Sequence, residues 1–136
     1  MSVSVNSKRG TLGFCIGLGL FASIFLMGGL LHFLFPAPYL RIIPPFLSRP
    51  KFILWLSGAA EMAGGAGLLL RKTRRMAAYG LALLLVAVFP ANIYMAAAHV
   101  PFPGIAGESW AQWLRLPLQI PLILWALYYA RSTKSE

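Results

Sequence analysis

Long uninterrupted apolar runs are the feature that most constrains what this chain can fold into. Three of them, at residues 11–33, 52–70 and 76–98, have the length that a helix needs to cross a bilayer, which is about 20 apolar residues. A fourth run, at residues 113–130, is long enough when Arg115 is taken to reach its charged end toward the headgroups. The sequence therefore predicts four membrane spans, with three spans and one interfacial helix as the alternative.

The composition argues against a soluble domain. Hydrophobic residues make up 59% of the chain and charged residues 11%, whereas soluble domains are about 45–50% apolar and about 25% charged. A net charge of +9 would suggest nucleic-acid binding in a soluble protein, but too little polar surface remains for that, so we expect no nucleic-acid partner. The single cysteine, Cys15, excludes an intramolecular disulfide and a Cys-x-x-Cys redox pair.

The fold class follows from the solvent. In lipid, only helices and closed barrels satisfy their backbone hydrogen bonds, and the apolar runs lack the alternation of barrel strands. The sequence therefore predicts an all-α integral membrane four-helix bundle, with residues 1–136 forming a single domain. The first run exceeds the core of a cleaved signal peptide and no Ala-x-Ala site follows it, so we expect it to be retained.

Basic residues predict the orientation of the bundle. The two terminal flanks and the turn at residues 71–75 would lie on one side and carry eight Lys and Arg residues, against four on the other side. Cytoplasmic flanks are enriched in Lys and Arg. We therefore expect both the N-terminus and the C-terminus in the cytoplasm.

The predicted outer loop at residues 35–51 is unusual because it is rich in proline and also apolar. Its five prolines are expected to prevent a regular helix. Tyr39 and Ile42 are among its apolar residues. Two interpretations remain open, namely a plain interfacial loop and a segment that caps the mouth of the bundle.

Polar side chains occur inside every predicted span, where an ionised group at mid-bilayer costs roughly 2.5–3.5 kcal/mol. Glu61 lies about 13 Å from the outer boundary of its span, close to the midplane. The candidate residues, which lie between the midplane and the outer boundary, are His32, Ser57, Glu61, Asn92, Arg115 and Gln119. We expect them to gather inside the bundle, either as a ligand site or as a purely structural network.

Local patterns support an inward position for these groups. Ser57 lies one helical turn before Glu61 and is placed to donate a hydrogen bond to it. Small residues on the same span permit close helix packing in lipid; they are Ser57, Ala60, Gly64 and Gly67. Pro90 interrupts the helical hydrogen bonds just before Asn92 and is expected to turn its amide inward.

A second small-residue pattern lies in the first span. Gly13 and Gly17 have the GxxxG spacing. This spacing fits either a homodimer contact or packing within the chain.

The polar set suggests proton exchange with a lipophilic ligand. A desolvated carboxyl group stays protonated, whereas Arg115 or a protonated His32 beside Glu61 would ionise it. A carboxyl and an imidazole group beside an apolar cleft suit a quinone headgroup, because quinol oxidation releases protons that these groups accept. One buried His and one Glu are too few ligands for a metal site, so none is predicted.

Several stretches carry a family resemblance. They are residues 32–36 with 39–45, residues 56–61 with Gly64 and Gly67, residues 74–77, residues 115–119 and the segment Phe89-Pro90-Ala91-Asn92-Ile93-Tyr94-Met95. In these stretches, and over about residues 12–130, the chain resembles the DoxX-like family of small bacterial membrane proteins. The resemblance implies a four-helix protein of the bacterial inner (plasma) membrane, related to subunits of quinone-coupled sulfur oxidation and to helpers of redox enzymes. It brings no agreed catalytic residues.

Three functions remain open at this point. The first is a redox-associated membrane subunit that binds quinone or quinol through the polar cluster and works with a redox protein complex. The second is a non-enzymatic assembly factor or partner subunit with a purely structural polar network. The third is a carrier of small solutes or protons. Whether the protein is an enzyme stays open, because the sequence contains no catalytic motif.

Overall fold

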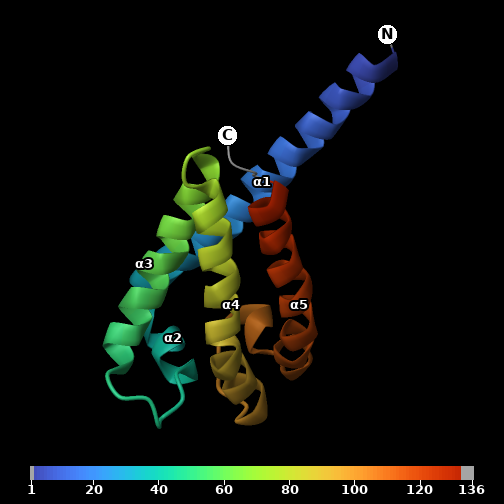
Figure 1. Ribbon diagram of the computed structural model, residues 1–136. Helices are drawn as coiled ribbons and strands as arrows, with labels where there is room; N and C mark the ends of the chain where they lie inside the picture. The colour runs from blue at the N-terminus through green and yellow to red at the C-terminus, as the bar shows by residue number, and fades with distance from the viewer. Residues whose placement is uncertain (1, 133–136) are drawn as a thin grey trace.

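The protein is all-helical in the part of the chain that the structure describes, a computed structural model of residues 2–132 with side chains described from residue 11 (Figure 1). The four long helices are α1 (Ser2–Leu34), α3 (Pro50–Leu69), α4 (Arg74–Ala97) and α5 (Ser109–Ser132). The short helix α2 (Pro36–Ile42) follows α1, and a 3-10 turn, η1 (Gly104–Gly107), lies between α4 and α5.

Three of the long helices can cross a membrane by length and composition, over Thr11–Leu34, Pro50–Leu69 and Arg74–Ala97. This confirms three apolar spanning segments. Helix α5 has 24 residues, as α4 does, but it is less apolar because it includes Gln112, Arg115 and Gln119. A spanning role for α5 stays a prediction.

The expectation that prolines keep residues 35–51 free of helix is wrong for the first part of this segment. Helix α2 begins at Pro36, and Pro38 lies in its first turn. The first N–H groups of a helix have no acceptor within the helix, so proline costs little there. Pro50 starts α3 in the same way.

The long helices form two pairs. Helix α1 packs along α3, α4 packs along α5, and the contact between α3 and α4 joins the pairs. Helix α1 crosses behind the others in Figure 1. It meets α5 through aromatic side chains, since the ring centroids of Phe21 and Trp125 are 4.6 Å apart. Phe21 and Tyr129 are fully buried in this core.

The turn between α3 and α4 is closed by side chains. Thr73 Oγ1 donates to the Gly67 carbonyl at 2.9 Å, and Arg74 Nε donates to the Leu68 carbonyl at 2.8 Å. These bonds satisfy carbonyl groups that the end of a helix leaves without partners. The Arg74 guanidinium also lies 5.9 Å from the centre of the Phe14 ring. The basic turn therefore holds α1, α3 and α4 together, besides its predicted role in topology.

Glycines set the close approach of α1 to α3. A Cβ atom on Gly29 would lie 2.7 Å from the Gly58 carbonyl oxygen, and one on Gly65 would lie 3.0 Å from the Ala22 carbonyl oxygen. The small residues Gly64 and Gly67 instead face α4. The contact with α1 thus uses a second row of glycines, which sequence analysis did not identify.

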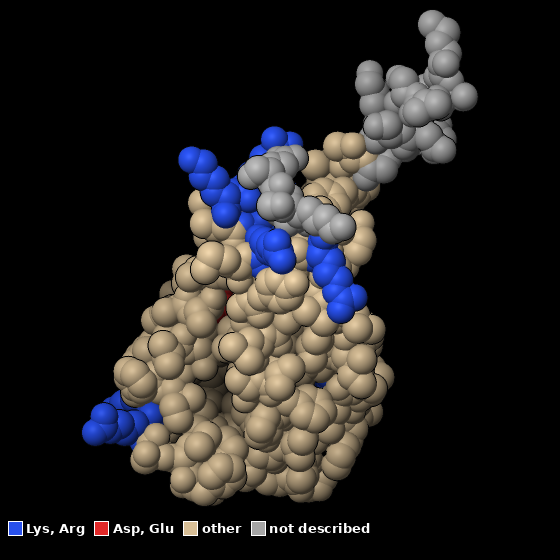
Figure 2. Space-filling view, viewed as in Figure 1, with Lys and Arg blue, Asp and Glu red and all other residues tan. Residues whose placement is uncertain are grey.

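Exposed basic side chains lie at the two ends of the molecule and leave an apolar band between them (Figure 2). The exposed basic residues are Arg71, Lys72, Arg75 and Arg131 at one end and Arg41, Arg49 and Lys51 at the other. The band between them exposes large apolar side chains, among them Leu20, Leu83 and Leu124. This distribution is typical of helices that lie across a bilayer.

Gly29→Ala is expected to lower the free energy of unfolding by about 1–3 kcal/mol, because the added methyl group meets backbone atoms of α3. Gly19→Ala, on the same helix, is the control because nothing lies within 4 Å of its Cβ position. It should leave stability unchanged or raise it by up to about 1 kcal/mol. Thermal unfolding in detergent measures both, and equal effects would contradict the proposed packing.

Candidate functional site

A cleft of about 1370 Å³ lies between the α1–α3 pair and the α4–α5 pair. All five α-helices and the connection that carries η1 contribute to its lining. Figure 2 shows a furrow in the apolar face of the molecule. Ligand sites are typically concave and mostly apolar, with a few polar groups that orient the ligand, and this cleft has that make-up.

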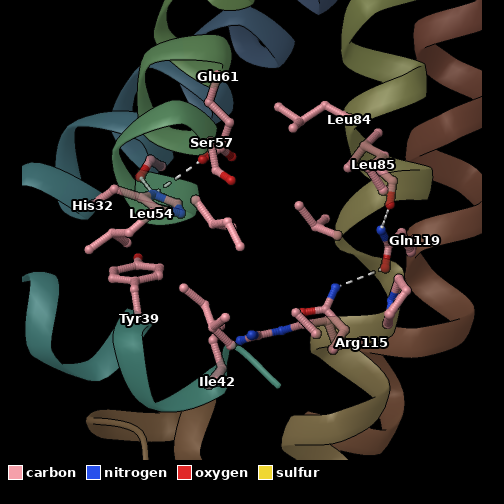
Figure 3. Close-up of a pocket in the computed structure, with 18 of the residues that line it drawn as sticks. His32, Tyr39, Ile42, Leu54, Ser57, Glu61, Leu84, Leu85, Arg115 and Gln119 are labelled. Atoms are coloured by element: carbon pink, nitrogen blue, oxygen red, sulfur yellow. Dashed lines mark hydrogen bonds and ion pairs between the residues drawn. The ribbon is translucent and has the colours of Figure 1, made fainter. Parts of the chain in front are cut away.

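All six candidate residues from the sequence line this cleft, and they lie on two opposing walls. His32 of α1 with Ser57 and Glu61 of α3 form one wall. Arg115 and Gln119 of α5 face them in Figure 3. The sixth residue, Asn92 of α4, belongs to this second wall.

The first wall contains a close imidazole–carboxyl contact. His32 Nδ1 lies 2.7 Å from the Gly28 carbonyl oxygen and 3.2 Å from Glu61 Oε2. The side chains of His32 and Glu61 are only 16% and 21% exposed. Because a carbonyl only accepts hydrogen bonds, Nδ1 carries a proton, and Nε2 is the nitrogen that remains for exchange.

One oxygen of this pair has no hydrogen-bond donor. Glu61 Oε2 is buried and accepts no hydrogen bond from any described residue, so the donation expected from Ser57 is not made to this oxygen. The proton on His32 Nδ1 points to Gly28. Most buried polar atoms in proteins are satisfied, and an exception indicates a place for a ligand, ion or water.

Tyr39 is part of the site, although sequence analysis did not select it. Its ring stacks on His32 with centroids 4.1 Å apart and an interplanar angle of 24°. Phe102 packs edge-on against the Tyr39 ring, with centroids 5.3 Å apart. Burial, and then the nearby Glu61 carboxylate, raise the pKa of Tyr39, so the phenol keeps its proton. The apolar composition of the proline-rich segment at residues 35–51 was the sequence feature that could have identified Tyr39. Because Tyr39 and Ile42 of this segment line the cleft, the structure favours a segment that caps the mouth of the bundle over a plain interfacial loop.

The second wall contains a chain of amide hydrogen bonds. Asn92 Nδ2 donates to Gln119 Oε1 at 2.9 Å, and Gln119 Nε2 donates to the Leu85 carbonyl. Gln119 is buried. Helix α4, which carries Asn92, continues through Pro90. The chain of bonds connects α4 to α5, and it uses Asn92 Nδ2 together with both polar atoms of Gln119.

Arg115 has no carboxylate partner in the described side chains. Its Nη1 atom lies 4.0 Å from Met95 Sδ, and no carboxylate of residues 11–132 lies within 4.0 Å of the guanidinium. Sequence analysis left Arg115 and His32 as alternative partners of Glu61. The structure selects His32.

Gln112 is a second polar residue that sequence analysis did not identify. It is buried and donates to the Val100 carbonyl at 2.9 Å and the Gly107 carbonyl at 3.4 Å. Because it lies next to an irregular connection, the burial of its amide could not be predicted from the sequence. It fastens the η1 segment to α5 and is absent from the lining of the cleft.

Gln119→Leu is expected to lower stability by roughly 1–2 kcal/mol, because it leaves the Asn92 amide without its acceptor. The double variant Asn92→Leu/Gln119→Leu removes both partners, so it should cost less than the sum of the two single variants. Thermal unfolding of the four proteins in detergent gives the coupling. Strictly additive losses would show that the two amides do not support each other.

Comparison with protein families gives one match. A family described as a domain of unknown function, DUF8561, matches residues 21–130, a range that includes all six candidate residues. Comparison with curated proteins finds no match, and comparison with solved structures finds none either. The chain therefore belongs to the DUF8561 family.

Proposed function

We propose that this protein is a four-helix, multi-pass subunit of a bacterial inner membrane that binds quinone or quinol in the cleft between its helix pairs. The cleft, with the Glu61–His32 contact on its wall, is the observation that carries the proposal. The resemblance to the DoxX-like family agrees with a redox-associated subunit. In this proposal both termini lie in the cytoplasm and α5 forms the fourth span.

The membrane placement rests on length and charge. Helix α5 has 24 residues, which gives about 36 Å of helix and is sufficient to cross the hydrocarbon core. It packs along α4, which is apolar enough to span by itself. The exposed basic residues at the α3–α4 turn favour the cytoplasm for that end.

The rim of the cleft supports a ligand that arrives from the membrane. Its lining includes strongly exposed apolar side chains, namely Leu56, Leu83, Trp110, Leu114 and Leu118. The opening is therefore continuous with the apolar band of Figure 2. A lipophilic molecule that dissolves in the bilayer would enter without crossing a polar barrier, and the volume leaves room for a ring with part of an isoprenoid tail.

The polar groups support a ligand that exchanges protons. Oxidation of a quinol to a quinone releases two protons and two electrons. The Glu61 carboxyl group lines the cleft, so a quinol hydroxyl group can donate to it. His32 Nε2 is a second candidate proton acceptor, because Nδ1 is the nitrogen that contacts Gly28 and Glu61. The electrons would pass to a redox partner protein in the same membrane.

The second candidate function is a non-enzymatic assembly factor or partner subunit. The amide hydrogen bonds of Asn92 and Gln119 favour this candidate, whereas Glu61 does not. Asn92 donates to Gln119, and Gln119 donates to the Leu85 carbonyl, so these amides bond within the protein as a structural network requires. Glu61 differs, because one of its oxygens is buried without a donor. A purely structural role leaves that oxygen unexplained, whereas a ligand hydroxyl group satisfies it.

Glu61→Gln and His32→Ala are each expected to lower the affinity for a short-chain quinol about tenfold or more, because each removes one member of the proton-accepting pair. The measurement is saturable quenching of tryptophan fluorescence in nanodiscs, since Trp110 lines the cleft. Glu108→Gln is the control, because Glu108 is exposed and does not line the cleft. Normal quinol binding by both cleft variants with intact folds would refute the proposal.

The topology is tested with single cysteines in a Cys15→Ser background, since Cys15 is the only cysteine of the chain. A membrane-impermeant maleimide applied to spheroplasts should label Ser48→Cys, in the loop before α3, and not Lys72→Cys, in the turn after it. Both positions are exposed, so exposure does not distinguish them. Labelling of Lys72→Cys alone would reverse the proposed orientation.

A further inference from the structure

Arg115 is a cation in the cleft for which the described structure supplies no anion. It lines the cleft from α5 and is half-buried. The only two acidic residues among the described side chains are Glu61, which contacts His32, and Glu108, which is exposed. Neither carboxylate lies within 4.0 Å of the guanidinium.

A guanidinium in this position is costly unless something compensates its charge. An ion taken from water into an apolar site loses several kcal/mol of hydration, and a missing partner leaves that loss uncompensated. Ionisable residues at membrane depth are rare, and they commonly mark a pathway or a ligand. The position of Arg115 therefore calls for an anion that the described protein does not provide.

Arg115 also has donors left to offer. Gln119 uses its amide nitrogen on Leu85 and its oxygen on Asn92. A guanidinium has five N–H donors in a planar fork that matches carboxylate and phosphate oxygens. Among the described residues, Arg115 Nη1 contacts the weak acceptor Met95 Sδ at 4.0 Å.

The two walls present opposite chemistry to a molecule between them. The Glu61 carboxyl group supplies an acceptor on one wall, and Arg115 lies on the opposite wall of the cleft (Figure 3). A hydroxyl group suits the first and an ionised oxygen suits the second. The space between them is lined by apolar side chains such as Leu54 and Leu84.

We propose that Arg115 forms an anion-binding subsite of the cleft, which selects amphiphilic ligands that carry an ionised oxygen. For a quinol, a use that rests on the proposed function, the subsite holds the oxygen opposite the one that faces Glu61, and it favours the form in which that oxygen is negatively charged. For other amphiphiles, the same subsite takes an ionised headgroup.

A matched pair of quinones tests this selection. An alkylated 2-hydroxy-1,4-naphthoquinone is ionised at neutral pH, whereas its 2-methoxy counterpart is neutral and nearly equal in size. Wild-type protein in nanodiscs should bind the ionised compound about tenfold more tightly. Arg115→Gln should lose this preference, because its affinity for the ionised compound falls more than its affinity for the neutral one. Arg115→Met, a second neutral variant, decides the matter if the Gln variant does not fold.

Arg41→Gln is the matched control, because Arg41 is an exposed arginine at the same end of the molecule and does not line the cleft. It should keep the preference of wild type. Absence of a preference in wild type, or a preference that persists in the folded Arg115 variants, would overturn the subsite.

A second ligand pair separates this inference from the proposed function. If wild type binds neither quinone, the proposed function fails, and a fatty acid is then compared with the fatty alcohol of equal chain length. Tighter binding of the carboxylate that depends on Arg115 would support the subsite without quinones. Equal binding of acid and alcohol would overturn it.

Discussion

The close contact of α1 with α3 at Gly29 and Gly58 is the constraint on which the rest of this structure depends. The two backbones meet where a single added methyl group would collide with main-chain atoms. This contact brings His32, one turn beyond Gly28, against Glu61. It also pairs α1 with α3. Helix α1 meets α5 through the aromatic cluster around Phe21, and the cleft lies between the two pairs.

The polar groups of the cleft fall into two kinds that composition cannot distinguish. Asn92 and Gln119 bond to each other and to a carbonyl group, and a network of this kind fixes helix positions. Glu61 and Arg115 each retain capacity that no described residue uses. In a medium without water such unused capacity is costly. These two residues therefore indicate a ligand, whereas the number of polar residues in the spans does not.

The sequence predicted the helices well because apolar runs of bilayer length depend on local composition alone. It also indicated which polar residues lie at similar depth, since depth along a helix follows from residue number, and all six line the cleft. It could not predict the pairing of α1 with α3, because Gly58 and Gly65 become informative only when a partner helix is known. It misjudged Pro36 because proline acts differently in the first turn of a helix than in its interior. Tyr39 was missed because ring stacking depends on how α2 folds back over His32. The DoxX-like resemblance stays a prediction beside the family match.

The contacts of Arg74 affect how charge-substitution experiments on the topology of such proteins are interpreted. Charge-reversal scans assume that a basic flank acts only through its attraction to one side of the membrane. Here the same side chain donates to a carbonyl of α3 and covers the ring of Phe14. Its removal would weaken a helical hairpin as well as the orientation signal, so an inverted product could not be told from a misassembled one by that substitution alone. Lys72, which is exposed in the same turn, changes the charge without that ambiguity.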